Sequence, residues 1–196
     1  MIAAERVALV LLAAGLSARF GPRDKLAEPL GGVPLALHAA TMLDAFPFAS
    51  RIAVTRGENS GLTACGFTLV VNEHPAEGQG RSIALGMGAI GAAEAVLIAL
   101  ADMPFVTAAH IQRLLDAFDG PDAIVASTDG ETHRPPVLFG AAHLAALLRS
   151  SGDRGPRELL RNATLVVAPK IELMDIDTAS DLAAAERERK IRSGAK

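Results

Sequence analysis

VALVLLAAGLSARFGPRDK, residues 7–25, joins an uninterrupted apolar run to a loop rich in small and cationic residues. Residues 7–14 carry no polar side chain, and the β-branched Val7 opens the run. A strand that is buried on both faces, as in a parallel sheet, has this pattern. The stretch therefore predicts a central strand that ends in a polar loop.

The rest of the chain alternates short apolar runs with segments of helical period. We expect strands at residues 51–55, 67–72, 95–101, 123–127, 136–139, 165–168 and 173–176, and helices at 34–45, 80–93, 107–118, 141–149, 155–161 and from 178 onward. This alternation predicts an α/β fold with three layers, doubly wound around a mostly parallel sheet. The 196 residues suit one domain, which we place at 1–185, followed by a charged tail at 186–196. Ligands of such sheets bind beyond the carboxyl ends of the strands.

Composition excludes several classes of partner. The formal net charge is −3, and the chain has seven Phe but no Trp or Tyr. Nucleic acids and anionic membranes require a basic surface, and base stacking requires aromatic side chains, so neither partner is expected. No apolar stretch reaches the ~18 residues of a membrane span. Cys65 is the only cysteine, which is typical of a reducing compartment, so we expect a soluble, cytoplasmic protein.

The loop after the first strand has the composition of an anion-binding site. Gly15 and Gly21 permit tight backbone turns, Ser17 adds a hydrogen-bond donor, and Arg19 and Lys25 add positive charge. Backbone amides and cations together suit a triphosphate. The alternative is a glycine-rich surface turn with solvated charges. The loop is not a Walker A motif, because no Ser or Thr follows Lys25.

Asp102 ends the apolar run at residues 95–101. A carboxylate at the end of a buried strand is costly unless it is paired or holds a cation. Mg²⁺ prefers one or two carboxylates together with phosphate oxygens and waters. The alternative role, capping the next helix, suits Thr107 better. Asp102 is therefore the predicted ligand of a Mg²⁺ cofactor.

Residues 12–25 resemble the signature loop of the small nucleotidyltransferases that include the molybdenum-cofactor cytidylyl- and guanylyltransferases, the MobA-like NTP transferases. That signature is Leu-Ala-Ala/Gly-Gly followed by Ser, Arg, Gly and Lys, and this chain meets it without gaps; the turn after residue 101 resembles the metal-binding turn of the same family. The resemblance implies a Rossmann-like fold of the nucleotide-diphospho-sugar transferase type. It also implies an enzyme that transfers a nucleoside monophosphate from a nucleoside triphosphate to a phosphorylated acceptor. In such an enzyme Arg19 and residues 15–21 wrap the triphosphate, Lys25 contacts the phosphates or the acceptor, and Asp102 holds the metal.

Later loops supply further candidate residues. Asp177 is either a second metal ligand, as in related nucleotidyltransferases, or a helix cap. Gly80 and Ser82 lie in a segment that resembles the base-reading loop of the family, although a plain helix start has the same composition. Asn72 ends an expected strand and is expected to face the site. The full predicted nucleotide-binding set is Leu12, Ala13, Ala14, Gly15, Ser17, Arg19, Gly21, Lys25, Asn72, Gly80 and Ser82.

Two segments are candidates for the acceptor side. Residues 133–139 resemble a Pro-Pro strand that lies by the acceptor site in cytidylyl members, although two prolines also suit any edge strand. Residues 152–157 either bring cations to an acceptor phosphate or form a solvated turn.

The base and the acceptor follow from the resemblance. Ala14 is typical of cytidylyl members, where guanylyl members usually have Gly, so CTP is favoured and GTP stays open. Molybdopterin is the implied acceptor and a molybdoenzyme the implied recipient; a sugar or polyol phosphate is the alternative. A different class also remains open, a non-catalytic nucleotide-binding chaperone of a molybdoenzyme.

Three other motif readings are rejected. Residues 86–91 match Gly-x-Gly-x-x-Gly, but they fall inside a helical pattern, so we interpret them as packing positions. The histidines lack the spacing of a zinc site, and no serine-hydrolase elbow surrounds Ser17.

Overall fold

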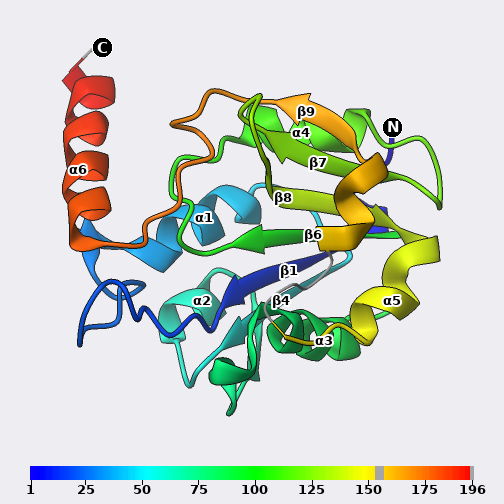
Figure 1. Ribbon diagram of the computed structural model, residues 1–196, viewed down its shortest axis with the longest axis horizontal. Helices are drawn as coiled ribbons and strands as arrows, with labels where there is room; N and C mark the ends of the chain where they lie inside the picture. The colour runs from blue at the N-terminus through cyan, green and yellow to red at the C-terminus, as the bar shows by residue number, and fades with distance from the viewer. Residues whose placement is uncertain (153–156, 195–196) are drawn as a thin grey trace.

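A central sheet organises the fold in the computed structural model, which describes residues 1–152 and 157–194. The sheet is seven-stranded, with the order β5-β4-β1-β6-β8-β7-β9 (Figure 1). Its strands are β1 (Val7–Ala13), β4 (Ser50–Thr55), β5 (Thr68–Val71), β6 (Ala95–Leu100), β7 (Ile124–Thr128), β8 (His133–Gly140) and β9 (Thr164–Val167). Strand β8 runs antiparallel to β6 and β7, and the other neighbours are parallel. The expected doubly wound, mostly parallel sheet is confirmed.

Strand β1 is buried on both faces. Because successive side chains of a strand point to opposite faces, Leu9 belongs to one core cluster and Val10 to a second. The helices that cover the two faces are α1 (Leu35–Asp44) and α4 (Ala108–Asp116) on the side of Leu9, and α3 (Gln79–Ala89) and α5 (Leu144–Leu148) on the side of Val10 (Figure 1). The uninterrupted apolar run of β1 is thus explained by helices on both sides.

Helix α3 approaches the sheet closely at Gly86. A Cβ atom there would lie 2.5 Å from Cγ1 of Val10 and 3.1 Å from Cγ2 of Val54. The expected packing role is confirmed for Gly86. Gly91 lies beyond the end of α3 and has open space around it.

The apolar residues before the last helix do not form the expected strand at 173–176. Leu173 and Ile176 are fully buried, but their segment is not part of the sheet. The amide of Ile176 donates instead to the carbonyl of Asp102 at 3.0 Å, so the chain crosses the end of β6. The strand prediction was wrong because burial of an apolar run requires packing, which need not come from strand pairing. This crossing brings Asp175 and Asp177 to the end of β6.

Helix α6 (Ala179–Gly194) includes residues 186–194, which we expected in a charged tail. Arg192 and Glu188 form an ion pair one turn apart, and Glu186 accepts a hydrogen bond from the amide of Gly31. Gly31 lies in the short hairpin of β2 (Pro29–Leu30) and β3 (Val33–Pro34), beside which α6 stands in Figure 1.

Several short elements differ from the expected ones or were not expected. The segment 141–149 begins as the 3-10 turn η3 (Ala141–His143) before α5, and η4 (Arg157–Asn162) is a 3-10 helix; residues 155 and 156 lie outside the described residues. Unexpected elements are η1 (Ala4–Arg6), α2 (Ser60–Ala64), η2 (Pro75–Glu77) and the β2–β3 hairpin. None of the helices within the described residues has the length and apolar character to cross a membrane.

Candidate active site

Three charged side chains from distant parts of the chain meet at the carboxyl ends of β1 and β6. Nζ of Lys25 donates to Oδ2 of Asp102 at 2.7 Å and to Oδ1 of Asp177 at 3.1 Å. The ammonium group is almost enclosed, since the side chain of Lys25 is 8% exposed. The first loop and the end of β6 therefore lie together, as the positions of the strands in the sequence predicted.

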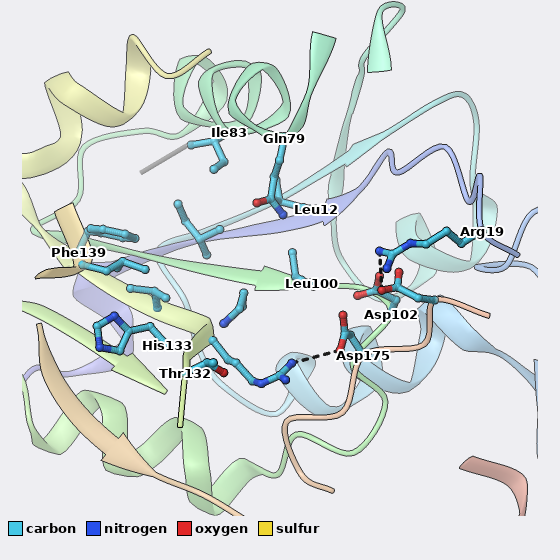
Figure 2. Close-up of a pocket in the computed structure, with 16 residues that line it drawn as sticks. Leu12, Arg19, Gln79, Ile83, Leu100, Asp102, Thr132, His133, Phe139 and Asp175 are labelled. Atoms are coloured by element: carbon cyan, nitrogen blue, oxygen red, sulfur yellow. Dashed lines mark hydrogen bonds and ion pairs between the residues drawn. The ribbon is translucent and has the colours of Figure 1, made fainter. Parts of the chain in front are cut away.

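Arg19 completes this cluster from the solvent side. Its Nη2 lies 2.7 Å from Oδ2 of Asp177, so each oxygen of that carboxylate faces a different cation. The side chain of Arg19 is 74% exposed, in contrast to Lys25. Figure 2 shows Arg19 and Asp102 together at one end of a pocket. Two cations thus balance two carboxylates in this cluster.

Burial and charge shift the protonation of the central pair. Burial raises the pKa of the Asp102 carboxyl, and the ammonium of Lys25 offsets part of this effect. Burial alone would lower the pKa of Lys25, but attraction to Asp102 and Asp177 outweighs it and raises that pKa. The ammonium therefore stays charged at neutral pH, and the carboxylate of Asp102 sits where additional positive charge is favourable.

The donor set fits a divalent cation. Oδ1 of Asp102 is buried and has no hydrogen-bond partner among the described residues. Asp177 supplies a second carboxylate beside Asp102, since both carboxylates contact the ammonium of Lys25. Residues 1–152 and 157–194 contain no group of three or more His, Cys, Asp or Glu that could hold a metal by itself. Two carboxylates without further protein ligands match Mg²⁺, which takes its remaining ligands from phosphates and water.

The competing role of Asp177 as a helix cap is taken by its neighbours. Oδ2 of Asp181 accepts hydrogen bonds from the amide and hydroxyl of Thr178, and Oγ1 of Thr178 accepts from the amide of Asp181. This reciprocal pair closes the start of α6. Likewise Oγ1 of Thr107 accepts from the amide of His110 and caps α4. The carboxylates of Asp102 and Asp177 are thus not used as caps.

The first loop lines a pocket of about 410 Å³ together with the segment before α3. Ser17 adopts a φ of 56°, which is unusual for a residue other than glycine, and its Oγ is buried without a partner among the described residues. Gly15 has no atom within 4 Å of the place a Cβ would take, so a ligand can approach its backbone. The lining residues of this pocket include Leu12, Ala14, Gly15, Lys25, Gly78, Gln79, Ser82 and Asp102.

Some predicted nucleotide-binding residues do not face this pocket. The amide of Gly80 donates to the carbonyl of Gly152 at 2.9 Å, and a Cβ on Gly80 would lie 2.6 Å from the backbone of Ser151. Asn72 is buried, and its side chain donates to Oγ of Ser82 at 3.0 Å and accepts from the amide of His74. Gly80 and Asn72 thus shape the loop, whereas Ser82 and Gln79 reach the pocket.

Four further members of that set are not among the lining residues of this pocket: Ala13, Ser17, Arg19 and Gly21. Ala13 packs in the core on the side of α1, and Gly21, at a φ of 110°, does not line the pocket. Direct contact with nucleotide stays a prediction for every member of the set.

A second pocket of about 470 Å³ adjoins the first and shares Leu12, Gln79, Leu100 and Asp102 with it. Its wall includes β8, through His133, Arg134, Val137 and Phe139. Figure 2 places Phe139 at the end away from Arg19 and Asp102, so one end is apolar and the other is charged. The Pro-Pro segment forms a strand on the wall of this pocket, and an acceptor bound there stays a prediction. Most of the segment 152–157 lies outside the described residues.

A buried hydrogen-bond chain holds the β8 bulge that forms this wall. The register between β7 and β8 shifts after Ala126, leaving Pro135 and Pro136 between paired positions. Ser127 donates to the carbonyl of Pro136 at 2.7 Å, so Nε2 of His110 must donate to Oγ of Ser127, at 2.7 Å. Arg113 can only donate, so Nδ1 of His110 accepts from it at 2.9 Å. Nothing local in the sequence indicated this series of hydrogen bonds, because its members lie on three different elements.

Comparison with known proteins is consistent with this geometry. Residues 9–168 match a family model described as the MobA-like NTP transferase domain. The chain belongs to the MobA-like NTP transferase family. This match spans the first loop, Asp102 and the β8 wall, and the predicted family is confirmed. The protein is accordingly a nucleotidyltransferase, an enzyme that acts on a nucleoside triphosphate and a phosphorylated acceptor.

Several relatives match this transferase along nearly their whole length. The purine catabolism protein PucB of Bacillus subtilis is 28% identical over 90% of this chain and 91% of its own. A molybdenum cofactor guanylyltransferase of Bradyrhizobium is 28% identical over 91% of each chain. The crystal structure of Rv0371c from Mycobacterium tuberculosis superposes with a TM-score of 0.79 at 22% identity, covering 94% of this chain and 99% of that one. A manganese complex of Rv0371c matches at 0.74 and 19% identity, covering 93% and 98%.

Proposed function

We propose that this transferase moves a nucleoside monophosphate from a nucleoside triphosphate, CTP in preference, to molybdopterin or its metal-loaded cofactor, with release of pyrophosphate. The observation that carries the proposal is the charged cluster of Lys25, Asp102, Asp177 and Arg19 at the junction of two pockets. A donor in the first pocket and an acceptor in the second would meet at Asp102. Family membership favours turnover over a purely nucleotide-binding role.

The reaction needs positioning and charge neutralisation more than proton transfer. A phosphate monoester loses its second proton near pH ~6, so the acceptor oxygen is already anionic at neutral pH and needs no general base. Lys25 and Arg19 offset the repulsion between the acceptor and the triphosphate, and backbone amides of the first loop with Ser17 orient the phosphates. Asp102 and Asp177 would hold Mg²⁺, which supplies neutralisation of the charge on the phosphate oxygens.

Support for the base and the acceptor comes from single features. Ala14 lines the first pocket and favours CTP by the resemblance described above. The similarity to a molybdenum cofactor guanylyltransferase supports a molybdopterin acceptor and keeps GTP as the second candidate base. The manganese complex of Rv0371c supports a divalent cation in this fold. A cytoplasmic location and a recipient molybdoenzyme stay predictions.

Pyrophosphate release tests the proposal directly. The purified protein is assayed with each of the four ribonucleoside triphosphates and Mg²⁺, with and without molybdopterin. We expect release with CTP that depends on molybdopterin and is lost in Asp102→Asn. Release with GTP alone would overturn the choice of base, and release that ignores molybdopterin would overturn the acceptor. Activity that survives in Asp102→Asn would remove Asp102 from the metal site.

A further inference from the structure

Arg134 is anchored on one side of the second pocket by an acid that the mechanism does not use. Nε of Arg134 donates to Oδ2 of Asp129 at 3.1 Å, and the side chain of Asp129 is 2% exposed. The amides of Thr132 and Glu131 donate to Oδ1 of Asp129 at 3.0 and 3.1 Å. The hydrogen bond from the amide of Thr132 is the largest of the causes that hold the pKa of Asp129 well below its usual range, and the amide of Glu131 and the guanidinium of Arg134 add to it. Asp129 is therefore ionised at neutral pH and holds the near edge of the guanidinium.

The other edge of the guanidinium is held loosely. Nη1 of Arg134 lies 3.3 Å from Oδ1 of Asp175, longer than the 2.7–2.9 Å typical of charge-assisted bonds. Arg134 is 31% and Asp175 40% exposed, so water reaches this contact. Both residues line the second pocket, and their contact is the dashed line that ends at Asp175 in Figure 2. An exposed pair of this kind contributes little and opens readily.

We propose that Arg134 binds the phosphate of the acceptor, and that Asp175 is the counter-ion that it exchanges for this phosphate. The inference rests on the proposed function, because it assigns a ligand group within the acceptor pocket. A guanidinium that is fixed at Nε still offers its outer nitrogens to two oxygens of a phosphate. Arg19, the other arginine of this pocket, is already paired with Asp177 at 2.7 Å. A phosphate dianion carries more charge than Asp175 and can therefore displace it from Arg134. A ligand with a single carboxylate carries the same charge as Asp175 and would not.

The two members of the pair have effects of opposite sign. Arg134→Gln removes the phosphate ligand, so we expect the KM for the acceptor to rise about 10- to 100-fold with the KM for the triphosphate unchanged. Asp175→Asn removes the competitor, so the acceptor KM falls about two- to fivefold. Lys170→Gln is the matched control, since Lys170 is 74% exposed and lies 3.9 Å from Glu131 outside the pocket. It removes the same charge and leaves both KM values unchanged.

Binding of inorganic phosphate separates this inference from the proposed function. The protein is saturated with a non-hydrolysable α,β-methylene triphosphate and titrated calorimetrically with phosphate, so no acceptor identity is assumed. We expect binding that weakens at least about tenfold in Arg134→Gln and is unchanged in Lys170→Gln. Absence of phosphate binding to the wild type, or equal binding to Arg134→Gln, would overturn the inference. So would an Asp175→Asn variant as impaired as Arg134→Gln, because the pair would then be a structural unit.

The remaining outcome concerns the proposed function alone. Phosphate binding that depends on Arg134, without pyrophosphate release from any triphosphate plus molybdopterin, would sustain the anion site and reject molybdopterin as the acceptor.

Discussion

Replacing Lys25 by methionine isolates the energetic role of the ammonium at the centre of the site. The variant keeps an unbranched side chain one atom shorter than lysine but leaves Asp102 and Asp177 without the ammonium between them. Breaking a buried pair by removing one partner costs roughly 3–5 kcal/mol. The side chains of Asp102 and Asp177 are 18% and 25% exposed, so water relieves part of this cost. We therefore expect the free energy of unfolding to fall by about 3 kcal/mol at pH 7.5.

The loss should depend on pH in a defined direction. Burial raises the pKa of Asp102, and attraction and hydrogen bonding to Lys25 offset part of this rise, so without Lys25 this pKa lies further above its ordinary value. A carboxyl whose pKa is higher in the folded than in the unfolded state destabilises the fold when ionised. Protonation on going from pH 7.5 to pH 5 should therefore recover part of the stability of Lys25→Met relative to the wild type.

Urea unfolding at the two pH values, followed by circular dichroism, measures both effects. Arg19→Met is the matched control, because it removes a charge from the same cluster at a side chain that is 74% exposed. We expect it to cost less than about 1 kcal/mol at either pH. Equal stability of Lys25→Met and the wild type, or a loss that grows on acidification, would refute the reasoning.

Three further perturbations test the site and the core. Asp102→Asn should weaken Mn²⁺ binding, measured by electron paramagnetic resonance in the presence of nucleotide. Loss of a residue that only supports a metal ligand weakens binding about 10- to 100-fold, and loss of the ligand itself should weaken it more. Unchanged affinity would exclude Asp102 as a ligand. Gly86→Ala places a methyl group 2.5 Å from a valine of β1 and should cost about 1–3 kcal/mol in thermal unfolding, whereas Gly91→Ala, in open space, should be nearly neutral. Burial lowers the pKa of His110 below 6.5, so the wild type should lose stability as the pH falls below about 6.5 toward that pKa. His110→Gln keeps one hydrogen-bond donor and one acceptor but does not titrate, so its stability should depend less on pH in urea titrations from pH 7.5 to 5. An identical pH dependence of the variant and the wild type would count against a buried neutral imidazole.

The residues that sequence reasoning located well are those attached directly to buried strands. Lys25 belongs to the loop after β1, and Asp102 follows β6. These two strands are adjacent and parallel, so their carboxyl ends lie at the same edge of the sheet. Their proximity therefore needed only the prediction of a parallel sheet, which hydrophobic runs and helical periods supported.

What sequence reasoning missed depends on what packs against each residue. The run at 173–176 has the composition of a strand, yet Ile176 is buried by crossing the end of β6. The amide of Gly80 donates to the carbonyl of Gly152, a contact that nothing near Gly80 in the sequence indicated. Arg134 and Asp129 were not predicted to form a pair, because a bulge determines which way β8 presents its side chains. Composition is blind to such choices, since each residue type is compatible with several surroundings.

By itself, the sequence determined the alternation of strands and helices, and with it the strand ends at which polar groups emerge, because side-chain period and turn composition are local properties. Only the tertiary structure decided that one ammonium would bind two carboxylates 77 and 152 residues away along the chain. That meeting depends on strand order and on the path of the segment before α6. Both are determined by the packing of the whole core, which no local stretch encodes.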